Sequence, residues 1–155
     1  MDSLQEIFEK VQMNEEVKID IKEFEDWLDN IGEDEYNYLE DLTLKKNEEI
    51  KNEIFSKYKN NEKLFTSLKM YRYTNNIQGL RIGGYIRWLD KKNEENWKML
   101  NGGILLKITF TNKGTYIVCK NNNRMMQYLF DKYYTFQKIT AEEFMCLMSN
   151  EVTNK

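Results

Sequence analysis

The sequence contains no histidine and no proline, and it has only two cysteines among 155 residues. Without histidine the chain has no imidazole to act as a general base, to bind a metal ion or to titrate near neutral pH. Cys119 and Cys146 are too few for a disulfide scaffold and cannot form a zinc site by themselves. We therefore expect a reduced intracellular compartment and interpret Cys119 as a buried small hydrophobic residue.

The signatures of secretion, of membrane insertion and of the common enzyme families are also missing. The first residues, MDSLQEIFEKVQ, carry acidic side chains and lack the basic start and long apolar run of a secretory signal. No stretch approaches the roughly 18 apolar residues that a membrane helix needs, and no nucleotide-binding, hydrolase, metalloprotease or redox motif occurs. We expect a protein of the cytoplasm, the nucleus or a virion that is not an enzyme. It should need no cofactor, no metal, no membrane and no small-molecule substrate.

Apolar residues recur every three or four positions in several segments, which predicts helices there. The predicted helices cover residues 4–11, 24–31, 36–59 (as one helix or two), 64–71 and 141–148. Capping boxes support three of them, at Ser3 with Glu6, at Asp20 with Glu23 and at Thr140 with Glu143. Gly32 is expected to end the second helix, and Asn60 or Asn61 to cap the fourth.

After Asn75 and Asn76 the apolar period changes from about 3.6 to 2, which predicts a β-sheet. The predicted strands cover residues 80–88, 104–110, 115–120, 125–130 and 136–139. Hairpin turns are expected at residues 112–114 and 121–123. In the first strand one face should carry Arg81, Tyr85 and Arg87, and the other Ile82, Ile86 and Trp88; in the second, one face should carry Ile104, Leu106, Ile108 and Phe110, and the other Leu105, Lys107 and Thr109.

The predicted fold class is therefore α+β. A helical N-terminal segment should precede a small antiparallel five-stranded sheet or SH3-like barrel, followed by a C-terminal helix. The glycine pairs Gly83–Gly84 and Gly102–Gly103 fall at or near strand starts, where a missing side chain permits sharp bending or the close approach of another backbone.

One segment carries a resemblance to known proteins. The run RIGGYIRWLDKKNEENWKMLNGGILLKITFTNKGTYIVCKNNN resembles short SH3-like or Tudor-like barrel modules, over about residues 80–139 at most. Within it, GGYIRWL and LNGGILLKI are similar to segments of uncharacterised proteins of nucleocytoplasmic large DNA viruses. The resemblance implies a non-catalytic binding or structural module. If the protein is viral, the resemblance implies a component of the virus particle. Abundant lysine, asparagine, isoleucine and tyrosine indicate an AT-rich genome, which agrees with a viral origin and equally with several cellular lineages.

The sign of the charge changes at the same boundary as the period. Residues 1–77 carry 11 basic and 19 acidic side chains, a net charge of −8, whereas residues 78–155 carry 12 basic and 7 acidic, a net charge of +5. We predict an acidic helical region over 1–77 and a basic β region over 78–155, which form one domain or two. Such opposed charges favour attraction between the regions, within one molecule or between copies, or different partners for each.

Two charged sets are candidate binding surfaces. Nine acidic residues and no basic one lie within residues 23–41, and their spacing fails the calcium-loop pattern. We interpret them first as a solvated face, then as a surface for a basic partner, with a metal or catalytic site as the remaining alternative.

In the basic region, cations and aromatic rings alternate along the predicted strands. The candidate partner-binding residues are Arg81, Tyr85, Arg87, Lys107, Arg124 and Tyr128. The leading hypothesis is a non-catalytic interaction or structural protein that binds a protein partner or self-associates. The alternative is a nucleic-acid-binding accessory factor, because cations contact phosphates while aromatic rings stack on bases.

Overall fold

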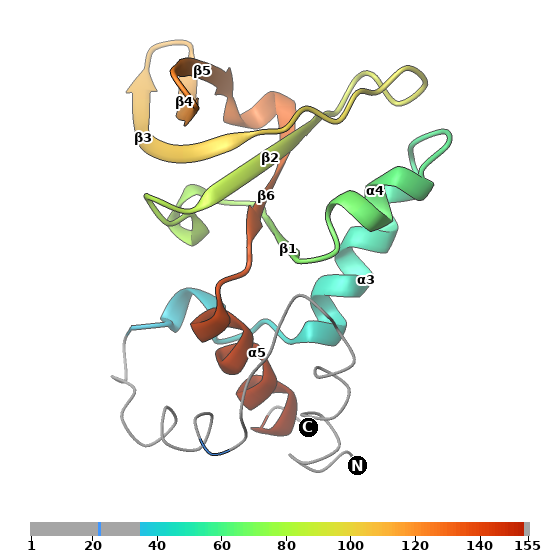
Figure 1. The fold of residues 1–155 in the computed structure, drawn as a ribbon, viewed down its shortest axis with the longest axis vertical. Coiled ribbons are helices and arrows are strands. Elements are labelled where there is room, and N and C mark those ends of the chain that lie inside the picture. Colours follow the sequence, from blue (N-terminus) through green and yellow to red (C-terminus); the bar gives the residue numbers. More distant parts are fainter. Residues whose placement is uncertain (1–21, 23–34, 154–155) are drawn as a thin grey trace. The chain divides into compact units, whose positions relative to one another are not determined.

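The computed structural model describes Lys22 and residues 35–153 (Figure 1). The label η marks a 3₁₀ helix. In chain order, the helices are η1 (Asn37–Leu39), α3 (Leu44–Phe55), α4 (Glu62–Ser67), η2 (Ile77–Gly79), η3 (Phe130–Lys132) and α5 (Ala141–Thr153). The strands are β1 (Tyr71–Thr74), β2 (Tyr85–Asp90), β3 (Gly103–Thr111), β4 (Gly114–Asn121), β5 (Arg124–Leu129) and β6 (Tyr133–Lys138). The structure combines helices with an antiparallel sheet, which confirms the predicted α+β class. The helices predicted over 4–11 and 24–31 lie outside the described residues. Within the described part, no helix is long and apolar enough to cross a membrane.

The described residues divide into two compact units, 35–48 with 139–153, and 49–138. The boundary at residue 77, which rests on period and charge, stays a prediction. In the first unit the capping box that opens α5 is confirmed: the Thr140 amide donates to Glu143 Oε1 at 2.9 Å, and the Glu143 amide donates to Thr140 Oγ1 at 3.1 Å. Tyr38 of η1 donates to the other carboxylate oxygen of Glu143 at 2.6 Å. One side chain thus caps α5 and fastens η1 to it.

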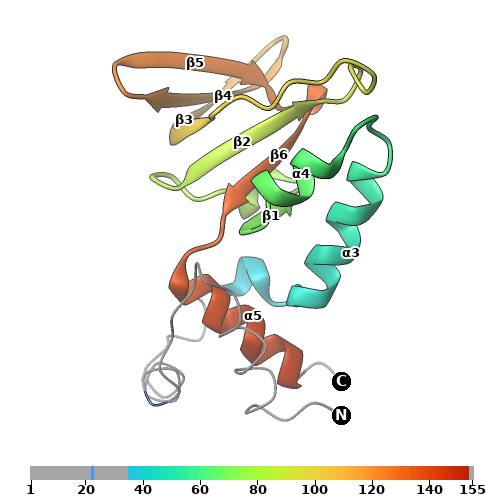
Figure 2. The same ribbon diagram turned by 45° about the vertical axis from the view of Figure 1, so that its right-hand side comes forward.

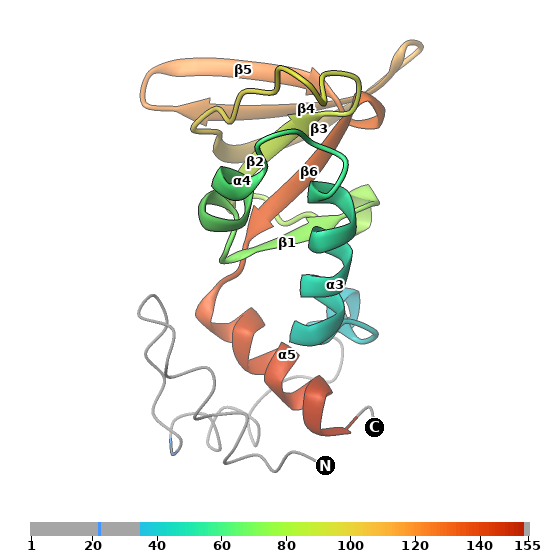
Figure 3. The same ribbon diagram turned by 90° about the vertical axis from the view of Figure 1, so that its right-hand side faces the viewer.

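The second unit contains an antiparallel sheet of six strands in the order β1-β6-β2-β3-β4-β5. Figures 2 and 3 show this order, with β5 at one end and β1 at the other. The prediction of five strands or a barrel is wrong, because among the described residues the sheet has six strands and stays open. Strand β1 begins at Tyr71, the last residue of a helix predicted over 64–71: α4 ends earlier, at Ser67, and Tyr71–Thr74 then pairs with β6. Pairing with a distant strand overrides local helical spacing here.

Two hydrophobic cores lie on opposite faces of this sheet. On one face, α4 and the end of α3 pack on the sheet; this first core contains Ile54, Phe55, Tyr58, Leu64, Leu68, Tyr71, Leu89 and Phe136. The second core contains Leu80, Ile86, Trp88, Leu105, Ile117, Cys119 and Tyr128. Trp88 of β2 stacks on Tyr128 of β5 with ring centroids 4.4 Å apart, although β3 and β4 lie between these strands. The sheet must therefore curl around the second core.

The first predicted strand starts later than its sequence pattern indicates. Strand β2 begins at Tyr85, and residues 81–84 form a turn in which the Gly84 amide donates to the Arg81 carbonyl. The Gln137 side chain takes the place of a neighbouring strand, because its Oε1 and Nε2 each bond the Arg81 backbone at 2.8 Å. Consequently Ile82, which was predicted to face the core, is 61% exposed.

A β-bulge changes the facing of residues in β3. The pairing with β4 runs from Leu105 opposite Cys119 directly to Lys107 opposite Val118, so Leu106 is the extra residue. Leu105 and Ile108 therefore both lie in or against the second core, three positions apart. The predicted alternation is correct for residues 107–109 and wrong for residues 104 and 105, since Ile104 is 46% exposed and Leu105 is fully buried.

Both predicted hairpin turns are confirmed in position, but each is a two-residue loop, shorter than the ranges 112–114 and 121–123. Asn112 and Lys113 connect β3 to β4, with Gly114 at φ +132° as the first residue of β4. Asn122, at φ 57°, and Asn123 connect β4 to β5. Asparagine and glycine tolerate positive φ, which is why these sequences specify tight turns.

The burial of Tyr128 predicts a loss of stability at alkaline pH. Burial raises the pKa of the Tyr128 hydroxyl above its ordinary value of 10.0, so the folded state keeps a proton that the unfolded state releases. The free energy of unfolding should then be at its full value below pH 10 and fall as the pH rises, by about 1.4 kcal/mol per pH unit for this group. Urea unfolding at several alkaline pH values should show a smaller slope for Tyr128→Phe; parallel slopes would contradict the prediction.

Candidate binding surface

Tyr85 and Arg87 lie on the face of β2 that carries the first core, opposite Ile86 and Trp88 as predicted. The Tyr85 hydroxyl donates to the Asn101 carbonyl at 2.6 Å. The Arg87 guanidinium donates to the carbonyls of residues 100 and 67 at 3.0 and 3.2 Å. These polar groups hold the connection that leads into β3.

The other four predicted residues lie in different surroundings. Tyr128 is 5% exposed, and its hydroxyl is 2.9 Å from Thr135 Oγ1, so its ring is part of the second core. Arg81 is exposed and donates to the carbonyls of residues 78 and 80. Lys107 and Arg124 are exposed on β3 and at the start of β5. The structure therefore does not bring the six residues together on one surface.

Arg87 lines a hollow of about 770 Å³ formed by α4 and the residues before β3. Lys59, Lys63 and Lys98 also line it, but so does Glu95, whose carboxylate pairs with Lys59 Nζ at 3.3 Å. Because Arg87 already donates to two backbone carbonyls, this hollow offers a ligand mainly exposed lysines.

A second hollow lies on the outer face of β3, β4 and β5, opposite the second core. Direct pairing across the three strands arranges that face in three rows. The rows are Ile104, Lys120 and Met125; Lys107, Val118 and Gln127; and Thr109, Tyr116 and Leu129. The bulge at Leu106 allows Ile104 and Lys107 to share this face.

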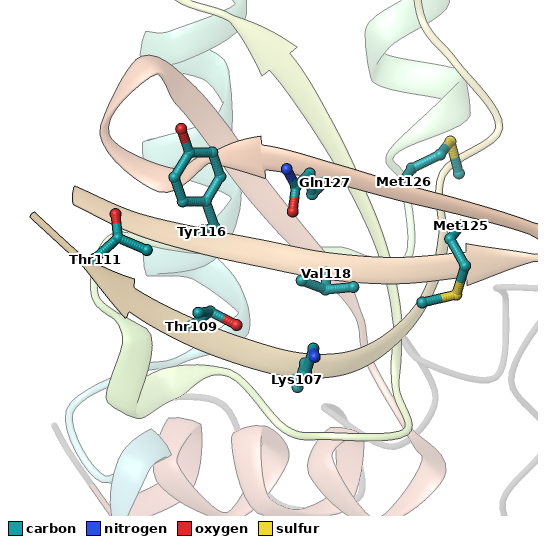
Figure 4. A pocket seen from close by; sticks show the side chains of 8 residues that line it. All are labelled: Lys107, Thr109, Thr111, Tyr116, Val118, Met125, Met126 and Gln127. Atoms are coloured by element: carbon teal, nitrogen blue, oxygen red, sulfur yellow. The ribbon is translucent and has the colours of Figure 1, made fainter. Parts of the chain in front are cut away.

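The hollow has a volume of about 620 Å³ and is called the β3–β5 hollow below. Its lining residues are Lys107, Thr109, Thr111, Tyr116, Val118, Met125, Met126 and Gln127. In Figure 4, Val118 lies on the middle strand between Lys107 and Gln127. Val118 is only 7% exposed although it points away from the second core, so its neighbours enclose it as a floor. The β3–β5 hollow thus combines an apolar floor with hydroxyl and amide groups at its sides.

The charge around the β3–β5 hollow has one sign. Residues 103–129 include Lys107, Lys113, Lys120 and Arg124 and no acidic residue. Large apolar side chains are exposed at its border: Ile104 at 46% and Met125 at 57%. This face should therefore attract an anionic ligand that also presents apolar groups.

The sequence predicted only Lys107 of the residues that line the β3–β5 hollow. Tyr116, Val118, Met125 and Gln127 were missed, because which face they occupy depends on strand register. One signal was present in the sequence: the absence of acidic residues over 103–129, within a chain whose net charge is −3.

The residues that line the β3–β5 hollow include no histidine, cysteine or carboxylate side chain. Cys119 of β4 points to the opposite face, is fully buried, and burial raises the pKa of its thiol. Among residues 22 and 35–153, no group of three or more histidine, cysteine, aspartate or glutamate side chains is placed to hold a metal ion. The arrangement is suited to binding by shape and charge. Comparisons with protein-family models, with curated proteins and with solved structures find no match to this chain.

Proposed function

We propose that this chain is a non-catalytic protein-interaction protein that binds an acidic, partly apolar segment of a protein partner in the β3–β5 hollow. The observation that carries the proposal is the uniform positive charge of residues 103–129 around an apolar floor at Val118. Carboxylates of the partner would meet Lys107 and Lys120, while its apolar side chains would contact Met125 and the floor.

Exposed apolar side chains beside basic residues favour a protein partner over a nucleic acid. The exposed side chains of Ile104, Leu106 and Met125 contribute only when they are covered by apolar surface, which an aliphatic or aromatic side chain of a peptide supplies. The basic residues guide association and favour acidic partners, an effect that salt weakens. The resemblance to viral proteins adds a virion or its assembly machinery as the setting that we propose for such a partner.

A nucleic acid is the second candidate, because it would meet the same cations and Tyr116 offers a ring on the outer face. Both aromatic residues among the six candidates are otherwise engaged: Tyr128 is in the core, and the Tyr85 hydroxyl donates to the Asn101 carbonyl. The sequence pI near 5.2 also disfavours non-specific phosphate binding by the whole chain. Nucleic acid is therefore an outcome of the test below.

The test uses a library of random linear peptides displayed on phage and selected on the full chain. We expect the selected peptides to be rich in aspartate, glutamate and large apolar residues. Their affinity, measured by fluorescence anisotropy, should fall roughly 10- to 100-fold in Lys107→Glu/Lys120→Glu, a loss of about 1.4 to 2.7 kcal/mol. Raising the salt concentration should weaken binding to the wild-type chain more than binding to the variant.

The matched control is Lys45→Glu/Lys69→Glu, which makes the same charge change at two exposed lysines outside residues 103–129. Peptides that bind both variants equally well, or a selection that yields no specific peptide, would contradict the proposal. Labelled single-stranded DNA and RNA are measured in parallel. If they bind in a Lys107- and Lys120-dependent way and peptides do not, the function is nucleic-acid binding.

A further inference from the structure

Strand β5 forms one edge of the sheet and, among the described residues, pairs only with β4. A two-residue turn connects β4 to β5, so the flanking residues Asn121 and Arg124 are expected to exchange both hydrogen bonds of a closely spaced pair. Because such pairs alternate along the strand, the main-chain groups of Arg124, Met126 and Tyr128 face β4. Those of Met125, Gln127 and Leu129 face away from it, toward the open edge.

The edge of β5 lacks the usual protection against pairing. Natural edge strands are commonly blocked by proline, by charged residues or by a bulge. The chain contains no proline, Arg124 at its first position is the only charged residue of β5, and the pairing of β4 with β5 has no register shift. Met125 is 57% exposed and Gln127 is also exposed, whereas Leu129 is half-buried, so the edge is accessible to solvent over its first part. An edge of this kind can template another strand.

The residues at this edge also belong to the β3–β5 hollow. Met125 and Gln127 line the hollow with their side chains, while their N–H and C=O groups face the edge. A strand placed beside β5 would therefore extend the sheet and direct every second side chain over the hollow. The main-chain contacts and the hollow are parts of one continuous surface.

We propose that the partner segment binds as an added β-strand along the edge of β5, with main-chain hydrogen bonds to Met125, Gln127 and Leu129. This inference rests on the proposed function and specifies its mode of recognition. The main-chain bonds supply sequence-independent affinity, and the side chains that point over the hollow supply specificity. The preferred segment alternates, with an acidic or large apolar residue at every second position.

The charge of the sheet argues against a second copy of this chain as the occupant. Pairing two β5 edges would place two sheets side by side, each with Lys107, Lys113, Lys120 and Arg124 and no acidic residue over 103–129. Only Arg124 lies on β5 itself, but the cations of both copies would then share one continued sheet, and their mutual repulsion disfavours pairing. An acidic partner segment removes that repulsion.

The test is a series of the selected peptides, each with one backbone amide N-methylated. Methylation removes a donor and blocks pairing on one side of the peptide. We expect an alternating pattern, in which methylation weakens binding about tenfold or more at every second residue and has little effect between. Amide hydrogen exchange of Met125, Gln127 and Leu129 should slow when the peptide is bound.

A substitution in β5 tests the same main-chain hydrogen bonds by changing the protein in place of the peptide. Gln127→Pro removes an N–H that faces the open edge, a position where an edge strand tolerates proline, and should weaken peptide binding about tenfold. Gln127→Ala is the control: it removes the side chain that lines the hollow but keeps the main-chain donor, so Gln127→Pro should bind the peptide about tenfold more weakly than Gln127→Ala. Circular dichroism checks that Gln127→Pro is folded; if it is not, the N-methylation series decides.

The outcomes separate the two proposals. Peptides that bind through Lys107 and Lys120 but show no alternation on methylation would overturn strand addition and leave the proposed function standing. A chain that selects no peptide would overturn both. A concentration-dependent dimer in light scattering that Gln127→Pro abolishes would mean that a second copy occupies the edge, which also overturns the proposal.

Discussion

Replacing Gly102 with alanine is expected to destabilise the protein by about 4 kcal/mol, the largest effect of any single substitution proposed here. A Cβ atom at this position would lie 2.0 Å from the Ile86 carbonyl oxygen and 2.8 Å from Arg87 Cγ. The backbone also has φ +76°, which alanine adopts only with strain. Relief of the clash requires β2 and β3 to separate where Ile86 pairs with Gly103, and that pairing helps to close the second core. Urea unfolding measures the loss.

Gly83→Ala is the matched control for this prediction. Gly83 also has a positive φ, +90°, but a Cβ built there would meet nothing within 4 Å. The control therefore carries only the backbone strain and should cost about 1 kcal/mol. Equal losses for the two variants would show that conformation alone, and not the approach of the Ile86 backbone, makes Gly102 necessary.

Lys51→Met is expected to destabilise the protein by about 3 kcal/mol. Lys51 lies on α3 and is only 2% exposed, and its ammonium group donates to the carbonyl oxygens of Leu68 and Lys69 at 2.9 and 3.1 Å. These carbonyls follow α4 and precede β1, so the ammonium group joins α3 to the connection that leads into the sheet. Methionine fills a similar volume but leaves both carbonyls without these charged donors. Thermal or urea unfolding measures the change.

Lys45→Met provides the control, because Lys45 is exposed on the same helix. It should change the free energy of unfolding by less than about 0.5 kcal/mol. If Lys51→Met were as stable as this control, the cost of burying the lysine would equal the contribution of its two hydrogen bonds. The ammonium group would then position β1 without a net gain in stability.

The parts of the fold that the sequence predicted depend on neighbouring residues. The Thr140 and Glu143 capping box and the turns at 112–113 and 122–123 are confirmed, because each is formed within a few residues. By the helical period, the apolar residues within 36–59 are candidate buried positions. Leu39, Ile54, Phe55 and Tyr58 are buried, whereas Tyr38 and Leu42 are half-buried and Ile50 is 37% exposed. A periodic pattern shows which side of a helix is apolar, while its partner decides how far that side is covered.

The candidate site was predictable only in its charge. Lys107 was identified as a cation that faces a partner, and it lines the β3–β5 hollow. Tyr128 was expected on a binding surface, yet it stacks on Trp88 in the second core, because the curl of the sheet brings β5 over β2. Trp88 and Tyr128 are 40 positions apart in the sequence, so no local sequence pattern predicts their contact.

The α+β class, the turns, the capped C-terminal helix and the positive charge of residues 103–129 follow from local amino-acid patterns. Three features instead depend on contacts between distant segments: Tyr71–Thr74 is a strand, Leu106 is a bulge, and the sheet stays open at β5. All three have one cause. A strand acquires its hydrogen bonds, its register and its buried face from a partner strand elsewhere in the chain, so its state follows from pairing that local sequence does not encode.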